Sequence, residues 1–263
     1  MSDSRVCTLD MEDGLAVLTL NRPDSLNALN KALKSELTHM IRTVGKPDSG
    51  ARALLITGAG RGFSSGADLM EAAAQGGAID PGADLIDSYN PLMNELAALP
   101  LPVVTAINGV AAGAGMSLAV AGDIAVAARS ARFIQSFVKI GLVPDAGSSH
   151  WLPRLIGLPR ARAMMMLGEE IPAQTAKDWG LIYDVVDDDS LMDRARLLAR
   201  QLAEGPTIAL GQIRQLLNRS TDNSYATQLQ AEAEAQRIAG RSKDCKEGVM
   251  AFAARKAPNF TGS

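Results

Sequence analysis

The sequence has few of the residues that hold metals or build disulfide frameworks. Its 263 residues include two cysteines, Cys7 and Cys245, and two histidines, His39 and His150. Two cysteines make no disulfide framework and lack metal-ligand spacing, and two histidines exclude a histidine-rich metal site. We therefore expect no metal, and we expect the protein in a reducing compartment, the cytoplasm.

Excess positive charge and long apolar runs are also lacking. Lysine and arginine number 26 against 29 acidic residues, a formal charge of −3. This charge gives no general attraction to nucleic acid or to an anionic membrane. The start of the chain, residues 1–5, is polar, and no apolar run reaches transmembrane length, so we expect no membrane span. The hydrophobic content of 47% is ordinary for a globular domain.

Strand and helix patterns alternate along the first part of the chain. A hairpin is predicted from two apolar stretches around Glu12–Gly14, and Asn30 is a candidate cap for a helix over Lys31–Val44. Further predicted elements are strands at Ala53–Thr57, Leu101–Ile107, Asp123–Ala127 and Ala131–Ile134 and a helix at Leu85–Leu99. Repeated strand–turn–helix units predict an α/β fold with a largely parallel sheet.

Helical periodicity dominates after Pro159, with one short strand at Leu181–Val186. The predicted helices are Arg160–Leu167, Ala173–Trp179, Leu191–Ala203, Thr207–Leu217, Tyr225–Ala239 and Lys243–Ala254. We divide the chain into a core of residues 1–200 and a C-terminal helical region of residues 201–263.

Two glycine-rich turns follow apolar strands. One contains Gly109, Gly113 and Gly115 and opens an apolar helix; the other runs from Gly58 into Phe63–Leu69. Unpaired backbone N–H groups at such turns bind a phosphate, a carboxylate or a transient oxyanion, although glycines also serve tight packing alone. Neither turn has the third small residue of a dinucleotide fingerprint, and no Walker lysine follows. Two N–H groups from separate turns suit a thioester carbonyl that becomes an enolate.

A sequence with these two turns resembles the crotonase family, also called the enoyl-CoA hydratase/isomerase superfamily. Five ordered blocks carry the resemblance: Leu20–Leu29, Phe63–Leu69, Asn108–Ala119, Ile140–Gly147 and Glu247–Phe252. The resemblance implies a spiral of repeated ββα units with a helical C-terminal trimerisation region. It also implies acyl-CoA substrates, no metal or redox cofactor, and a homotrimer or a dimer of trimers.

The resemblance also assigns site residues. The backbone N–H groups of Ala67 and Ala114 would form an oxyanion hole. The groove for the adenine and pantetheine of CoA would be lined by Asn27, Ala28, Phe63, Ser65, Asp68 and Leu69. The CoA phosphates would be met by Arg22 and by Phe252 and Lys256 of the same or a neighbouring subunit. Leu69–Ile79 would form a mobile segment over the acyl pocket.

Two departures from the family pattern concern proton transfer. Hydratases of this family use two glutamates, and those positions hold Ser117 and Phe137, the latter in the substrate pocket. Neither side chain exchanges protons near neutral pH, so hydration is not expected. Asp145 is another carboxylate, and its apolar sequence neighbours predict desolvation and a raised pKa. Such a group shuttles a proton between carbons, which is double-bond isomerisation; alternatively, Asp145 caps the following turn.

The block Lys139–Arg154 is most similar to the branch that isomerises ring-epoxidised phenylacetyl-CoA and related enoyl-CoAs, with this aspartate as the catalytic group. We therefore expect an acyl-CoA isomerase, with Asp145 as proton shuttle. Three alternatives stay open. They are a hydrolase or dehalogenase with nucleophilic Asp145, a triad of Ser117, His150 and Asp145, and a catalytically silent CoA-binding protein. The sequence does not identify the acyl group.

Overall fold

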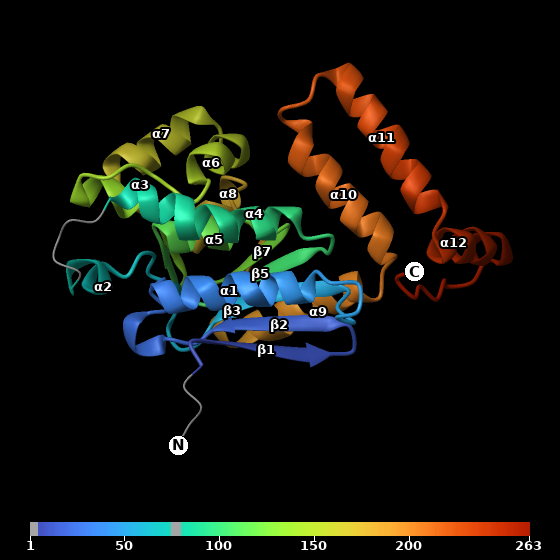
Figure 1. Ribbon diagram of the computed structural model, residues 1–263, viewed down its shortest axis with the longest axis horizontal. Helices are drawn as coiled ribbons and strands as arrows, with labels where there is room; N and C mark the ends of the chain where they lie inside the picture. The colour runs from blue at the N-terminus through green and yellow to red at the C-terminus, as the bar shows by residue number, and fades with distance from the viewer. Residues whose placement is uncertain (1–4, 75–79) are drawn as a thin grey trace.

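The computed structural model describes residues 5–74 and 80–263 and contains two β-sheets (Figure 1). The larger sheet has the strand order β1-β2-β3-β5-β7-β10. Its strands are Cys7–Glu12, Leu15–Leu20, Ala53–Gly58, Val103–Ile107, Ile124–Ala128 and Asp184–Val186. β1 and β2 form the predicted antiparallel hairpin, and the pairs from β2 to β10 are parallel. The predicted α/β class with a largely parallel sheet is confirmed.

A second sheet, in the order β4-β6-β8-β9, consists of three-residue strands. They are Gly62–Ser64, Val110–Ala112, Arg132–Ile134 and Glu170–Pro172. β4, β6 and β8 each follow a strand of the larger sheet after a short turn, and they pair in parallel. The chain therefore alternates between the sheets and then enters helical structure, which is the predicted spiral of ββα units. The sequence patterns indicated β8 but not the other three strands.

The helices over Lys31–Val44, Leu191–Ala203 and Lys243–Ala254 have their predicted bounds. The helices are α1 Lys31–Val44, α2 Leu69–Ala74, α3 Pro81–Asp84, α4 Asn90–Ala98, α5 Ala114–Val120, α6 Ser148–Ile156, α7 Leu158–Leu167, α8 Ala173–Asp178, α9 Leu191–Ala203, α10 Thr207–Ser220, α11 Tyr225–Gly240 and α12 Lys243–Ala254. Short helical turns are η1 Pro23–Ser25, η2 Leu85–Tyr89, η3 Ser136–Ile140 and η4 Asp188–Ser190. The Asn30 side chain accepts the Leu33 N–H at 2.9 Å, so the predicted cap is confirmed.

Helices cover the larger sheet, and its central strands are buried along their whole length. α1 packs on β1 and β2, and α9 packs on β3, β5 and β7. The predicted helix Leu85–Leu99 is instead a π-helical turn, η2, followed by α4. Of the segment expected to be mobile, 69–74 form α2, whereas 75–79 lie outside the described residues.

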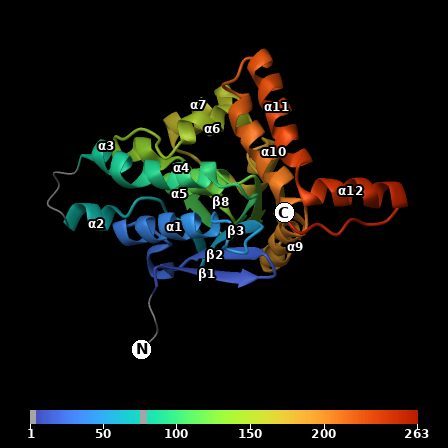
Figure 2. The ribbon, with the colours of Figure 1, turned by 45° about the vertical axis from the view of Figure 1, so that its right-hand side comes forward.

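The helices α10, α11 and α12 form an arm that extends from the body in both views (Figures 1 and 2). Arg214 of α10 holds the arm to the core, because its guanidinium pairs with Asp123 at 2.8 Å and donates to the carbonyls of Leu96, Ala97 and Leu99. α9 packs on the sheet up to Ala203, slightly past the predicted core limit. In 5–74 and 80–263, no helix combines the length and apolarity that a bilayer crossing requires.

Candidate active site

The two glycine-rich turns lie against each other because β4 and β6 pair in parallel and end together. A Cβ atom placed on Gly66 would stand 2.6 Å from the Ala112 carbonyl oxygen and 3.4 Å from the Ala114 nitrogen. A Cβ atom on Gly115 would stand 2.6 Å from Ser64. Glycine is therefore required for this approach of two backbones. The approach brings Ala67 and Ala114 onto adjoining turns.

The backbone N–H groups of Ala67 and Ala114 have no acceptor in the part of the chain that the structure describes. Their neighbours are fixed: Gly113 N–H donates to the Ile134 carbonyl at 2.8 Å, and the Gly66 carbonyl accepts the Leu29 N–H at 2.7 Å. Two free donors on a rigid backbone suit an oxyanion that forms during a reaction.

The two positions that differ from the hydratase pattern are both engaged in packing. The Ser117 Oγ is 3.3 Å from the Gly113 carbonyl oxygen and 3.1 Å from that of Asp145. The buried Phe137 ring lies 3.5 Å from the place of a Cβ on Gly113. Ser117 thus links the turn of Gly113 to the loop of Asp145, and neither Ser117 nor Phe137 replaces a glutamate.

The backbone carbonyl of Asp145 accepts hydrogen bonds from the start of α6, whose N-cap is Gly147. Its carbonyl accepts the Ser148 N–H at 3.0 Å, the Ser148 hydroxyl at 2.9 Å and the Ser117 hydroxyl at 3.1 Å. The carboxyl Oδ1 is buried and has no partner within the described residues. The alternative in which the Asp145 side chain caps the turn is therefore wrong.

Burial raises the pKa of Asp145 to about 6; the positive charge of Lys34 opposes this rise and the negative charge of Asp84 adds to it. The predicted rise of the Asp145 pKa is confirmed. Of the four apolar residues expected to desolvate the carboxyl group, Phe137 is buried and the other three are exposed. Val143 is 78% exposed, and Ile140 and Leu142 are exposed as well.

Four carboxylates act on the phenol of Tyr89, whose pKa is raised by burial and by the charges of Asp145, Asp84, Glu71 and Asp68. Three of them have partners. Asp84 pairs with Lys34 at 2.7 Å, Asp68 pairs with Arg22 at 2.8 Å, and Glu71 accepts the Lys31 N–H at 2.9 Å. Asp145 is the member of this group whose carboxyl makes no such bond among the described residues. It is therefore the one suited to exchange a proton.

Three of the predicted CoA-groove residues have side chains that serve the loop itself. The Asn27 amide is fully buried; it accepts the Arg22 N–H at 2.8 Å and donates to the carbonyls of Ala59 and Gly62. Phe63 is buried in the core, and the Arg22 guanidinium bonds Asp68 and the Ala28 carbonyl. The expectation that these side chains face the ligand is corrected: they hold the backbone, and Arg22 already has an anionic partner.

The remaining predicted groove residues lie along the same loop. Ser65 is half-buried and donates to the Ser25 carbonyl at 3.1 Å, and Leu69 is exposed at the start of α2. Phe252, 87% exposed, and Lys256 belong to the C-terminal arm, at the opposite end of the molecule from α2 (Figures 1 and 2). A single chain does not bring these two residues to the site.

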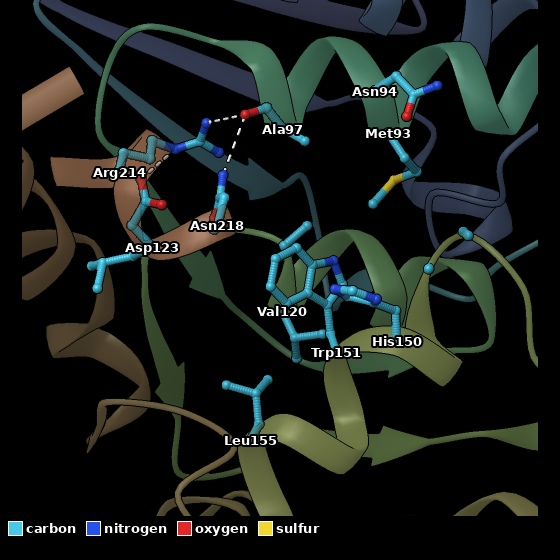
Figure 3. A pocket seen from close by; sticks show the side chains of 15 residues that line it. Met93, Asn94, Ala97, Val120, Asp123, His150, Trp151, Leu155, Arg214 and Asn218 are labelled. Atoms are coloured by element: carbon cyan, nitrogen blue, oxygen red, sulfur yellow. Dashed lines mark hydrogen bonds and ion pairs between the residues drawn. The ribbon is translucent and has the colours of Figure 1, made fainter. Parts of the chain in front are cut away.

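A cavity of about 420 Å³ lies behind the Asp145 loop, between α4, α6 and α10 (Figure 3). His150 and Trp151 line it, with their rings in edge-to-face contact at 4.8 Å. Since the Ser117 hydroxyl bonds carbonyl groups and His150 faces this cavity, the Ser117–His150–Asp145 triad is not formed. No cluster of three or more metal-ligating side chains occurs in 5–74 and 80–263.

Two residues near Asp145 had no place in any motif: Lys34 and Tyr89. Lys34 is three residues before Leu37 and seven before Ile41, so it lies on the apolar face of α1. That position was a signal in the sequence, because a lysine on a buried stripe needs a charged partner. Tyr89 gave no comparable signal.

Comparisons with known proteins show the family of this chain. Residues 10–263 match the family model described as enoyl-CoA hydratase/isomerase. The 1,2-epoxyphenylacetyl-CoA isomerase of Escherichia coli is 48% identical, over 96% of this chain and 97% of its own length. The 2,3-dehydroadipyl-CoA hydratase of the same organism is 35% identical over 94% of each chain. A crystal structure from Mycobacterium abscessus, described as an enoyl-CoA hydratase/isomerase, matches with a TM-score of 0.90 at 39% identity, over 98% of this chain and all of that one. This chain therefore belongs to the enoyl-CoA hydratase/isomerase family.

Proposed function

We propose that this protein is an acyl-CoA isomerase that shifts a double bond, or rearranges an epoxidised ring, in a CoA thioester. The observation that carries the proposal is the carboxyl group of half-buried Asp145, whose Oδ1 is buried without a partner among the described residues. The Ser117 hydroxyl, 3.1 Å from the Asp145 carbonyl oxygen, joins this loop to the turn of Ala114. The name of the E. coli relative, 1,2-epoxyphenylacetyl-CoA isomerase, supports the same reaction class.

The proposed reaction uses two parts of the site in turn. The thioester carbonyl accepts hydrogen bonds from the Ala67 and Ala114 N–H groups, so that negative charge on its oxygen is stabilised. The Asp145 carboxylate removes a proton from the carbon between the thioester and the double bond, and the C–H electrons form the enolate. The protonated Asp145 then returns the proton to the distal carbon as the double bond shifts. The thioester is the substrate, and these proposed steps require no cofactor.

Hydration is disfavoured by what Ser117 and Phe137 do. Water addition needs one group to activate water and another to protonate the α-carbon. The Ser117 hydroxyl is bonded to backbone carbonyls, and Phe137 has no titratable group. The single carboxyl of Asp145 suffices for a proton shuttle.

The test is turnover of a 3-enoyl-CoA in deuterated water by the wild type and by Asp145→Asn. We expect the variant to lose about 10²–10⁴-fold in kcat and to lose deuterium incorporation, because it has no base. Asp193→Asn, an exposed residue of α9, is the matched control and should behave as the wild type. An undiminished rate in Asp145→Asn, or rapid hydration of crotonyl-CoA by the wild type, would overturn the proposal.

We also propose that the arm of α10 to α12 joins chains into a homotrimer or a dimer of trimers. The support is its exposed apolar side chains, among them Tyr225, Val249 and Phe252. Association would also carry Phe252 and Lys256 toward the CoA groove of a neighbour. Light scattering of the wild type and of Phe252→Asp tests this; a monomeric wild type would contradict it.

A further inference from the structure

The cavity behind the Asp145 loop is not used by the reaction described above. Its volume of about 420 Å³ falls within the range of small-molecule sites, about 300–1,000 Å³. Its walls are mostly apolar, and they include Met93 of α4, Val120 of α5, Trp151 and Leu155 of α6, and Leu217 of α10 (Figure 3). Walls of this kind favour a ligand that covers them with apolar surface of its own.

α5 joins the cavity to the candidate site. Ala114 begins the helix and carries one proposed oxyanion donor, and the Ser117 hydroxyl in the middle of the helix bonds the Asp145 carbonyl. Val120, the last residue of the helix, lines the cavity. The proposed oxyanion donor, the loop of the proposed proton carrier and the cavity therefore follow one another along α5.

The loop of Asp145 makes a second connection. The next two residues of the chain, Ala146 and Gly147, both line the cavity. Ala146 is buried and Gly147 has no side chain, so this part of the loop presents a single methyl group. An acyl group that runs from the oxyanion donors past Asp145 is therefore directed toward the cavity.

The length of α5 decides which acyl groups extend that far. Its seven residues rise about 10 Å, at about 1.5 Å each. A fully extended chain advances about 1.2 Å per bond, so about eight bonds lead from the thioester carbon to the cavity. The ring of a phenylacetyl group ends about five bonds from that carbon, at about 6 Å. A straight acyl chain of about ten carbons therefore reaches the cavity, whereas a phenylacetyl ring does not.

We propose that the cavity is the subsite for the distal part of the acyl group, and that it selects straight medium-chain acyl groups over compact ring-derived ones. This role rests on the proposed function, since it starts from a thioester held at the N–H groups of Ala67 and Ala114. Met93 and Trp151 determine the specificity, because their side chains come from α4 and α6 and point toward one another in the cavity (Figure 3). A thioether and an indole ring are both suited to contact with an alkyl chain.

The first experiment measures the binding of saturated acyl-CoAs, which have no double bond to move. Trp151 and Trp179 are the two tryptophans of the chain, so Trp179→Phe leaves Trp151 as a fluorescent reporter in the cavity. We expect Kd to fall about two- to fourfold for each methylene added between octanoyl- and dodecanoyl-CoA. The Trp151 emission should move to shorter wavelength with these ligands but not with butyryl-CoA or phenylacetyl-CoA.

Two adjacent alanines of α4 provide a matched pair of variants. Both are exposed, but Ala97 lines the cavity and Ala98 does not. Ala97→Phe should fill the cavity and remove the dependence of Kd on chain length, without changing the binding of butyryl-CoA. Ala98→Phe should behave as the wild type. With 3-enoyl-CoAs, Ala97→Phe should lower kcat/KM for the dodecenoyl substrate at least tenfold and leave that for the hexenoyl substrate unchanged.

The binding series separates failure of this subsite from failure of the proposed reaction. Equal Kd values for butyryl- and decanoyl-CoA, with an unmoved Trp151 emission, overturn the subsite even if Asp145→Asn is inactive. A chain-length dependence that persists in Ala97→Phe also overturns it, because the chain then lies elsewhere. If Ala97→Phe removes the dependence while Asp145→Asn keeps full turnover, the subsite is supported and the proposed function is overturned instead.

Discussion

The glycine-rich turns of Ala67 and Ala114, which carry the proposed oxyanion hole, and the loop of Asp145 are built differently. The Ser117 hydroxyl links the loop to the turn of Ala114. The turns present main-chain N–H groups and are held by backbone contacts that admit no side chain at Gly66 or Gly115. The Asp145 loop presents a side chain, contains a left-handed Ala146, and carries exposed apolar residues such as Val143.

In the proposed reaction, this difference separates charge stabilisation from proton transfer. Main-chain donors persist whatever side chain Ala67 or Ala114 carries, whereas a proton carrier changes with one substitution. Both isomerases and hydratases occur among the relatives of this chain.

The largest expected effect comes from breaking the turns. Gly66→Ala places a methyl group on the Ala112 carbonyl and should displace the Ala67 N–H, lowering kcat by about 10²–10³-fold, the value of one oxyanion donor. Gly50→Ala is the matched control, because Gly50 has a similar positive φ but no atom within 4 Å of the added Cβ. Steady-state kinetics check the pair; equal activity of the two variants would mean that the turn tolerates the contact.

In the Asp145 loop, we expect a substitution that removes activity to raise stability. The folded pKa of Asp145, about 6, lies above the unfolded value near 3.9, so its contribution to stability is lost as the pH rises from about 4 through 6. Asp145→Asn removes this penalty and should gain about 1–2 kcal/mol at pH 7.5, allowing for partial exposure, but nothing at pH 4.

Urea unfolding at both pH values measures this gain. Asp193→Asn controls for the loss of a carboxylate as such. A variant less stable than the wild type at pH 7.5 would mean that the Asp145 carboxylate has a bonding partner in solution.

The sequence predicted the regular elements well because their signals are local. α1, α9 and α12 have the predicted bounds, since apolar periodicity over three or more turns decides them. β4 and β6, with three residues each, are too short for a period-two pattern and form because two turns of the spiral bring them together. Their existence required the tertiary fold.

The sequence predicted individual residues of the site but not the residues that surround them in space. The resemblance located Asp145, and its raised pKa agrees with the prediction. The neighbours in space, Lys34 and Tyr89, come from residues 111 and 56 positions earlier, and no spacing rule joins them to Asp145. Asn27 was predicted to line the groove because it lies in a block that resembles the family. Its amide instead makes hydrogen bonds to the backbone of Arg22, Ala59 and Gly62.

The smallest expected effect concerns Ser117, which joins the two regions. Ser117→Ala removes a hydroxyl shared by the Gly113 and Asp145 carbonyls, at a cost of about 1 kcal/mol for a neutral hydrogen bond. If this bond aligns the loop with the turn, kcat should fall roughly five- to tenfold at unchanged KM. The pH profile should not move, because a neutral group is lost. Ser220→Ala, a neutral exposed hydroxyl on α10, is the control. An unchanged kcat would mean that the Ser148 bonds alone hold Asp145, and that the turns and the loop work as independent parts.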